Sequence, residues 1–178
     1  SELLWFISGS TNLYDLRAIL HGENNRYQDS CKTIWDANYN CQAKQLGYEN
    51  GELGPIYGAI WRDFNQDNCY DQLKVVIDQL KNNSDSRRII LTTWNPLLLH
   101  KQTLPACHCF TQFKVYNNKL SCMMTMRSVD LALGMPTDIV TYALLTSILA
   151  QVCNLDLGEL IISTGDTHIY LNHIDGVK

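Results

Sequence analysis

The sequence predicts an α+β fold, in which helices pack on a mixed β-sheet. Residues 70–81 repeat apolar side chains at spacings of three and four, the pattern of an amphipathic helix. Residues 109–116 and 120–127 have the composition of strands and flank Asn117-Asn118, a dipeptide that favours a tight hairpin turn. A chain that contains both patterns is expected to combine helices with antiparallel strands.

The second strand of this hairpin has a predicted inner face. Alternation in 120–127 places Leu120, Cys122, Met124 and Met126 on one side of the sheet. The other expected elements are helices over 2–8, 12–20 and 138–153 and strands over 88–94 and 159–164.

The region around the second helix is polar. Ser10, Thr11 or Asn12 can provide the N-cap of that helix. Residues 22–55 are rich in Asn and Gly and are expected to form a long ordered loop. Long loops in compact domains are often functional.

Composition bounds the class of protein. The chain has 178 residues, 46% of them hydrophobic, which is enough for a single globular domain over residues 1–178. The net charge of −4, with scattered Lys and Arg, argues against a general nucleic-acid surface but allows a small anion held by a few arginines. No apolar run approaches the roughly 18 residues of a membrane span, and no signal peptide is visible. We therefore expect a cytoplasmic protein (host cytoplasm if it is viral) that needs neither membrane nor nucleic acid.

The two ends of the sequence suggest a fragment of a longer protein. The chain begins at Ser1 rather than Met, and residues 173–178 end without a finishing element. We expect a single catalytic domain that lacks an N-terminal segment and a C-terminal tail.

The cysteines predict thiols rather than disulfides or metal ligands. There are seven, an odd number without paired spacing, which favours a reducing compartment. Cys107-His108-Cys109 is locally rich in ligands, but adjacent residues do not easily close a tetrahedral site and no second ligand pair follows. We expect no metal.

Cys107 is a candidate nucleophile. It lies in the stretch LPACHCF, just before an expected strand. The alternative is a buried small hydrophobe, which describes most cysteines. A thiolate needs positive charge or hydrogen-bond donors nearby, and the sequence offers Arg87-Arg88 and Arg127.

The same arginines form a candidate phosphate site. Arg127-Ser128 end one expected strand and Arg87-Arg88 begin another. Arginines at strand ends are often only solvated, but three of them with a serine hydroxyl suit phosphate, because the guanidinium fork matches its oxygens.

A row of polar residues near the C-terminus is a candidate sugar site. The stretch GDTHIYLNH places Asp166, His168, Tyr170 and Asn172 at alternate positions, hence on one face of an extended chain. Such a row is unusual for a core face and suits the hydroxyls of a sugar.

Seven stretches carry a family resemblance, and they are ELLWFISGSTN, TIWD, GELGPIYGAIWRDF, DSRRII, LPACHCFTQF, MRSVDLALGMPTDIVTYALL and GDTHIYLNH. In order and spacing they resemble the thymidylate synthase family over essentially the whole chain. The resemblance implies an α+β fold and a homodimer formed through the sheet. It also implies transfer of a one-carbon unit from the co-substrate 5,10-methylenetetrahydrofolate to C5 of a pyrimidine deoxynucleotide monophosphate.

The resemblance also implies roles for individual residues. The implied catalytic residues are Cys107, Glu2, Tyr57, His108 and Asp138. The implied substrate-binding residues are Arg87, Arg88, Gln112, Arg127, Ser128, Asp130, Gly134, Asp138, His168 and Tyr170. Trp35 and Asp130 match folate-side positions. In the family Cys107 would add to C6 of the base, and Arg87 and Arg88 would reach the phosphate from the partner subunit.

Two positions depart from the family members that use dUMP. Those enzymes carry Asn where this chain has Asp138, and Gln where it has Met126. Deoxycytidylate hydroxymethylases of the same family carry Asp and a Met-Arg-Ser triplet at these places. An ionised Asp offers only acceptors, which repel O4 of uracil but accept the N4 amino group of cytosine. The prediction is therefore a preference for dCMP, with methylation or hydroxymethylation left open.

Three alternatives stand beside this prediction. The first is an ordinary thymidylate synthase that converts dUMP to dTMP and tolerates Asp138. The second is an inactive homologue that binds nucleotides or RNA, which the presence of Cys107, Arg127 and His168 disfavours. The third concerns Asp138 alone, which would serve only as a helix cap.

Overall fold

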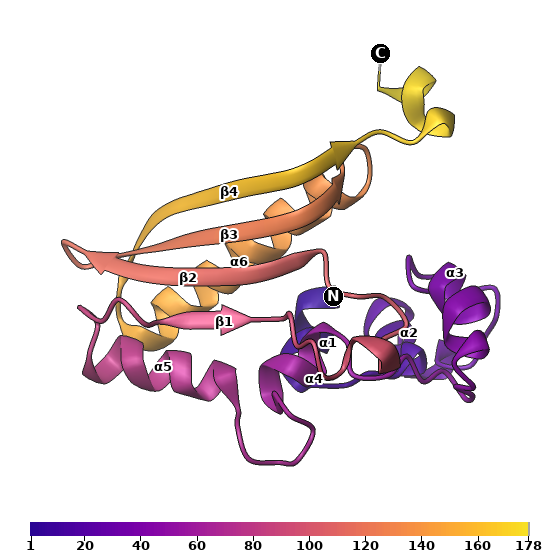
Figure 1. The fold of residues 1–178 in the computed structure, drawn as a ribbon, viewed down its shortest axis with the longest axis horizontal. Coiled ribbons are helices and arrows are strands. Elements are labelled where there is room, and N and C mark those ends of the chain that lie inside the picture. The colour runs from indigo at the N-terminus through magenta and orange to yellow at the C-terminus, as the bar shows by residue number, and fades with distance from the viewer. Residues whose placement is uncertain (178) are drawn as a thin grey trace. The chain divides into compact units, whose positions relative to one another are not determined.

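The computed structural model describes residues 1–177 and divides into two compact units (Figure 1). The first unit comprises Ser1–Leu73 and Thr93–Ala106. The second comprises Lys74–Thr92 and the residues from Cys107 onward. Each unit is described by itself below.

The first unit is built from short helices. They are α1 (Glu2–Ser8), α2 (Leu13–His21), η1 (Glu23–Asn25), α3 (Asp36–Asn38), η2 (Tyr39–Ala43), α4 (Tyr57–Arg62) and η3 (Leu99–Lys101). The predicted helices at 2–8 and 12–20 are confirmed, with the second shifted by one residue. Its cap is Asn12, whose Oδ1 accepts from the backbone N–H of Tyr14 at 2.9 Å. The expected long loop over 22–55 is interrupted by three short helical turns.

An aromatic cluster forms the core of the first unit. Phe6 in α1 lies against Tyr57 and Trp61 in α4, with ring centroids 5.0 and 5.6 Å apart. Gly58 permits this approach, because a Cβ there would lie 2.5 Å from the carbonyl oxygen of Phe6. The two helices therefore fix each other through backbone contact as well as ring packing.

The second unit is a mixed four-stranded sheet with helices. Its elements are α5 (Gln72–Asn82), which begins at the end of the first unit, β1 (Ile90–Thr92), β2 (His108–Tyr116), β3 (Lys119–Asp130), α6 (Gly134–Cys153), β4 (Asp156–His168) and η4 (Leu171–Gly176). The strand order is β1-β2-β3-β4. The first two pairings are antiparallel, and β3 pairs with β4 in parallel through the crossover helix α6 (Figure 1). The α+β prediction is confirmed.

The predicted hairpin is confirmed at its turn and on its inner face. Asn117 and Asn118 adopt φ of 49° and 63°, the left-handed values that a two-residue hairpin turn requires. The four residues Leu120, Cys122, Met124 and Met126 are at most 1% exposed. The strands on either side depart from expectation, since β1 covers three residues and β4 is longer than 159–164.

Helix α6 is longer than expected and begins at Gly134. Within residues 1–177 it is one helix that is long and apolar enough to cross a membrane, contrary to the expectation from the sequence. Its buried residues Tyr142, Leu145 and Leu149 belong to the core of the second unit, where α6 packs on β3. One face of α6 therefore belongs to this core, whereas Val140 and Leu144 are exposed in the single chain.

Candidate active site

In the first unit the structure brings Glu2, Trp35 and Tyr57 together. Glu2 is the first residue of α1, and its Oε1 accepts from Trp35 Nε1 at 2.6 Å. The Trp35 and Tyr57 rings meet edge to face with centroids 6.0 Å apart. Burial raises the pKa of Glu2 against the opposing effect of this hydrogen bond. A carboxyl group with a raised pKa is suited to proton transfer near neutral pH.

A buried ion pair holds the segment that carries Trp35. Arg17 Nη2 lies 2.5 Å from Asp36 Oδ1, and the two side chains are 3% and 8% exposed. The backbone N–H of Thr33 donates to the other oxygen of Asp36 at 2.6 Å. Burial by itself would raise the pKa of Asp36, but the hydrogen bonds from Arg17 and Thr33 outweigh it and hold the pKa below its usual value. Sequence reasoning missed Arg17, although a charged residue on the inner face of an amphipathic helix is a signal for such a pair.

In the second unit Cys107 lies beside Arg127. Cys107 immediately precedes β2, and its carbonyl accepts from the backbone N–H of Arg127 in β3 at 2.8 Å. The guanidinium Nη2 lies 3.9 Å from Cys107 Sγ. The sulfur is half-buried. The predicted pairing of a thiol with a cation is present in this unit.

His108 connects the start of β2 to helix α6. Its side chain is 5% exposed, with Nδ1 at 2.7 Å from Tyr142 Oη and Nε2 at 3.6 Å from Asp138 Oδ1. Burial lowers the pKa of His108 to about 3, so the ring is neutral at physiological pH. Met126 is the register partner of His108 in β3. Both positions that depart from the dUMP-using enzymes therefore adjoin His108.

The alternative in which Asp138 serves as a helix cap is wrong. The N-cap of α6 is Leu133, and Asp138 is the fifth residue of the helix, one turn in. Its side chain is 17% exposed. Asp138 is therefore placed by the helix, and its carboxylate is available for a role other than capping.

The ends of β3 and β4 bring three of the predicted nucleotide-side residues, Ser128, Asp130 and His168, close to one another. Ser128 pairs with Asp166 and Asp130 pairs with His168 in the parallel register. Asp130 Oδ1 also accepts from the backbone N–H of Ala132 at 3.0 Å, which shapes the turn that leads to Gly134 and α6.

The predicted polar row in GDTHIYLNH is only partly realised. His168 Nδ1 lies 2.8 Å from Asp166 Oδ1, and the Tyr170 ring meets the His168 ring edge to face at 5.1 Å. Strand β4 ends at His168 and η4 begins at Leu171. The expectation for Asn172 is wrong, because the extended alternation stops before that residue.

Arg87, Arg88 and Gln112 lie at the β1 edge. Both arginines are exposed in the single chain. Gln112 in β2 donates from Nε2 to the carbonyl of Arg87 at 3.0 Å. The segment before β1 therefore presents two cations to solvent.

The sequence of this chain was compared with those of known protein families. The family described as thymidylate synthase matches residues 1–178. The chain belongs to this family. The family membership predicted from the seven stretches is confirmed.

Relatives and a solved structure agree with the family. The thymidylate synthase of Enterobacteria phage T4 is 51% identical over 100% of this chain and 60% of that protein. That of Francisella tularensis (strain LVS) is 46% identical over 99% of this chain and 62% of that protein. A crystal structure of thymidylate synthase from T4 phage superposes with a TM-score of 0.90 at 51% identity, covering 99% of this chain and 59% of that one. The chain thus spans about 60% of the length of these relatives.

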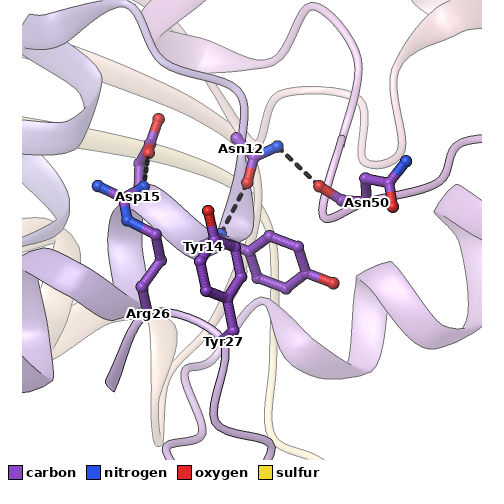
Figure 2. Close-up of a pocket in the computed structure, with 6 residues that line it drawn as sticks. All are labelled: Asn12, Tyr14, Asp15, Arg26, Tyr27 and Asn50. Atoms are coloured by element: carbon purple, nitrogen blue, oxygen red, sulfur yellow. Dashed lines mark hydrogen bonds and ion pairs between the residues drawn. The ribbon is translucent and has the colours of Figure 1, made fainter. Parts of the chain in front are cut away.

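The structure contains a cavity of about 560 Å³ in the first unit that none of the predicted site residues lines (Figure 2). Its polar groups are bonded to one another: Asn12 donates to the carbonyl of Asn50 at 2.9 Å, and Arg26 pairs with Asp15. Within residues 1–177, no group of three His, Cys, Asp or Glu side chains is placed to hold a metal ion.

Proposed function

We propose that this chain carries the core of a thymidylate synthase, which transfers a one-carbon unit from 5,10-methylenetetrahydrofolate to C5 of dUMP and yields dTMP. The observation that carries the proposal is Cys107 held beside Arg127, next to a neutral, buried His108. The relatives described above, which are named thymidylate synthases, support dUMP as the substrate over dCMP. Because the chain spans about 60% of those proteins, the activity is proposed for the whole protein.

The proposed reaction begins at Cys107. C5 of a pyrimidine is a poor nucleophile until a thiolate adds at C6, which turns the ring into an enolate that can attack a carbon electrophile. The folate supplies the carbon and the hydride. Arg127 and Ser128 would hold the phosphate, and His168 and Tyr170 the ribose hydroxyl. Glu2, with its raised pKa, would manage proton transfers, and Trp35 would contact the folate.

A specific observation favours dCMP as a second candidate substrate. Asp138 adjoins His108, and the other departure, Met126, is the register partner of the same histidine. An ionised carboxylate at this place offers acceptors to a cytosine amino group and repels O4 of uracil. Where a site is built around such a hydrogen bond, the wrong partner loses about 10⁴-fold.

The deciding experiment compares the two nucleotides. Full-length enzyme and methylenetetrahydrofolate are incubated with C5-tritiated dUMP or dCMP, and the released tritium and the product mass are measured. We expect release from dUMP with dTMP as product. Turnover of dCMP alone would contradict the proposal and favour the second candidate, and the product mass would then distinguish methylation from hydroxymethylation. Release from neither nucleotide would favour the inactive homologue.

Asp138→Asn is the matched variant for this experiment. If Asp138 reads the base, the substitution raises the ratio of kcat/KM for dUMP over dCMP, because an amide donates to O4 whereas a carboxylate does not. An unchanged ratio would show that Asp138 has no part in reading the base.

The proposal includes a homodimer and a cytoplasmic location. Arg87 and Arg88 are exposed in the single chain, and most residues of β4 are exposed along the sheet. A symmetric partner could cover this surface and receive the two arginines. The cytoplasm is the compartment in which the thiol of Cys107 would stay reduced.

A further inference from the structure

We propose that Tyr142 is a positioning residue: its hydroxyl donates to His108 Nδ1 and thereby keeps the ring N–H on Nε2, facing Asp138. The inference about the tautomer stands on geometry and does not depend on which nucleotide the protein uses. Its catalytic consequence rests on the second candidate of the proposed function, dCMP, for which Asp138 would read the base.

The three side chains form a continuous polar path inside an apolar layer. Tyr142 lies four residues after Asp138, so both project from the same face of α6. Tyr142 is 0% exposed, and its ring meets the His108 ring edge to face with centroids 5.2 Å apart. The Tyr142 Oη to His108 Nδ1 distance of 2.7 Å is that of a short hydrogen bond.

Two arrangements of the protons are compatible with these distances. In the first, Tyr142 donates to Nδ1, and the single N–H of the neutral ring is on Nε2, directed at Asp138 Oδ1. In the second, Nδ1–H donates to Tyr142, and the Nε2 lone pair faces a carboxylate oxygen at 3.6 Å. The second arrangement sets two acceptors against each other in a buried place.

The protonation state of Tyr142 and its second hydrogen-bond partner favour the first arrangement, in which Tyr142 donates to His108. Burial raises the pKa of Tyr142 well above its usual range, so the phenol keeps its proton. A hydrogen bond from Thr111 opposes this rise in pKa, which identifies Thr111 as a second neighbour of the Tyr142 oxygen. With Thr111 donating to it, the Tyr142 oxygen has its own proton available for His108. The Nε2–H then faces Asp138 Oδ1 at 3.6 Å, an electrostatic contact that is longer than a hydrogen bond.

The consequence is that the edge of His108 that faces Asp138 is an N–H donor, which favours the ionised carboxylate and biases its orientation toward the ring. A base-reading group that is fixed before the substrate arrives discriminates better than a mobile one. Tyr142 would thus act on specificity through His108, without contact with the substrate.

The tautomer can be observed directly by NMR. The full-length protein is labelled with ¹⁵N in histidine, and long-range ¹H–¹⁵N spectra give the protonated nitrogen of each ring. The signals of His108 are identified by their absence in His108→Gln. We expect His108 to be neutral with the proton on Nε2. A proton on Nδ1 in the unsubstituted protein would overturn the proposal without any variant.

Tyr142→Phe and Thr146→Val form a matched pair. Both remove a buried hydroxyl from α6, but Thr146 Oγ1 donates to the backbone carbonyl of Tyr142 at 2.7 Å. Tyr142→Phe should shift the His108 signals away from pure Nε2–H, whereas Thr146→Val should leave them unchanged. Unaltered His108 signals in Tyr142→Phe would refute the positioning role.

The ratio of kcat/KM for the two nucleotides is a measurement that a purely structural role of Tyr142 would leave unchanged. Tyr142→Phe should lower kcat/KM by about tenfold, which corresponds to the loss of one hydrogen bond. It should also bring the kcat/KM values for dUMP and dCMP closer together. A uniform loss for both nucleotides would mean that Tyr142 does not act on specificity. Failure of the proposed function is distinguishable, because it appears as absent turnover in the unsubstituted enzyme and leaves the NMR result standing.

Discussion

His108 is buried where a charged imidazole would be poorly solvated. Its burial predicts that the free energy of unfolding falls at acidic pH. Its folded pKa of about 3 lies below the ordinary value of 6.5, so the unfolded chain binds a proton that the folded chain does not. Stability from this residue is full above pH 6.5 and falls as the pH drops toward 3, by up to about 1.4 kcal/mol per pH unit. Urea unfolding between these pH values would measure the decline.

The control for this prediction is His108→Gln. Its unfolding free energy should fall less steeply over the same range, because only the other titratable groups of the chain then contribute to the slope. If the unfolding free energies of the two proteins fell in parallel with pH, the pKa of His108 would not be lowered in the folded protein.

Cys107 and Cys109 are two thiols in one strand segment, and only the first is proposed as the nucleophile. Cys107→Ser should lower turnover by at least about 10³-fold while nucleotide affinity stays within a few fold. Cys109→Ala, which removes the neighbouring thiol, should keep its turnover. Tritium release and equilibrium binding measure the two effects. Loss of turnover in Cys109→Ala alone would assign the reaction to the other sulfur.

At the scale of elements, the contact of α2 with the start of α3 depends on the Arg17–Asp36 pair. Arg17→Met should lower the free energy of unfolding by about 3–5 kcal/mol, because it leaves Asp36 charged and buried without its partner. Arg26→Met is the matched control, since solvent screens the ion pairs of Arg26 with Glu23 and Asp15 and a smaller effect is expected. Urea unfolding of both variants would test the difference, and equal losses would contradict it.

The elements differ in how far the sequence predicts them. Helix α1 and the hairpin turn at Asn117-Asn118 carry local signals, namely periodicity and residues that tolerate positive φ. The extent of β1 is different, because its three residues are set by pairing with Gln112, Thr111 and Phe110 in β2. Pairing partners distant in sequence leave no local pattern.

For the whole molecule, the motifs predicted the family correctly, but they did not predict the arrangement around His108. Asp138 was expected in the first turn of a helix, whereas α6 begins four residues earlier. Tyr142 and Arg17 were missed, since a single polar residue in an otherwise apolar stretch does not reveal its partner. Such partners come from tertiary packing between a strand and a helix distant in sequence.

In the proposed homodimer, Arg87 and Arg88 of each chain would lie at the active site of the partner. If Arg87 and Arg88 serve the partner's site, an enzyme with Cys107→Ser and one with Arg87→Glu and Arg88→Glu are each inactive as homodimers. When the two are unfolded, mixed equally and refolded, half of the dimers are mixed, and each mixed dimer has one intact site. A two-fold symmetric dimer should then recover about a quarter of the unsubstituted activity.

The same mixing experiment would also show whether the arginines instead act within their own chain. If the arginines act on the site of their own chain, a mixed dimer contains one site without Cys107 and one site without both arginines, and no activity returns. Sedimentation of the refolded mixture would confirm that dimers formed. Both arginines are exposed in the single chain, so the substitutions should change catalysis without unfolding the second unit.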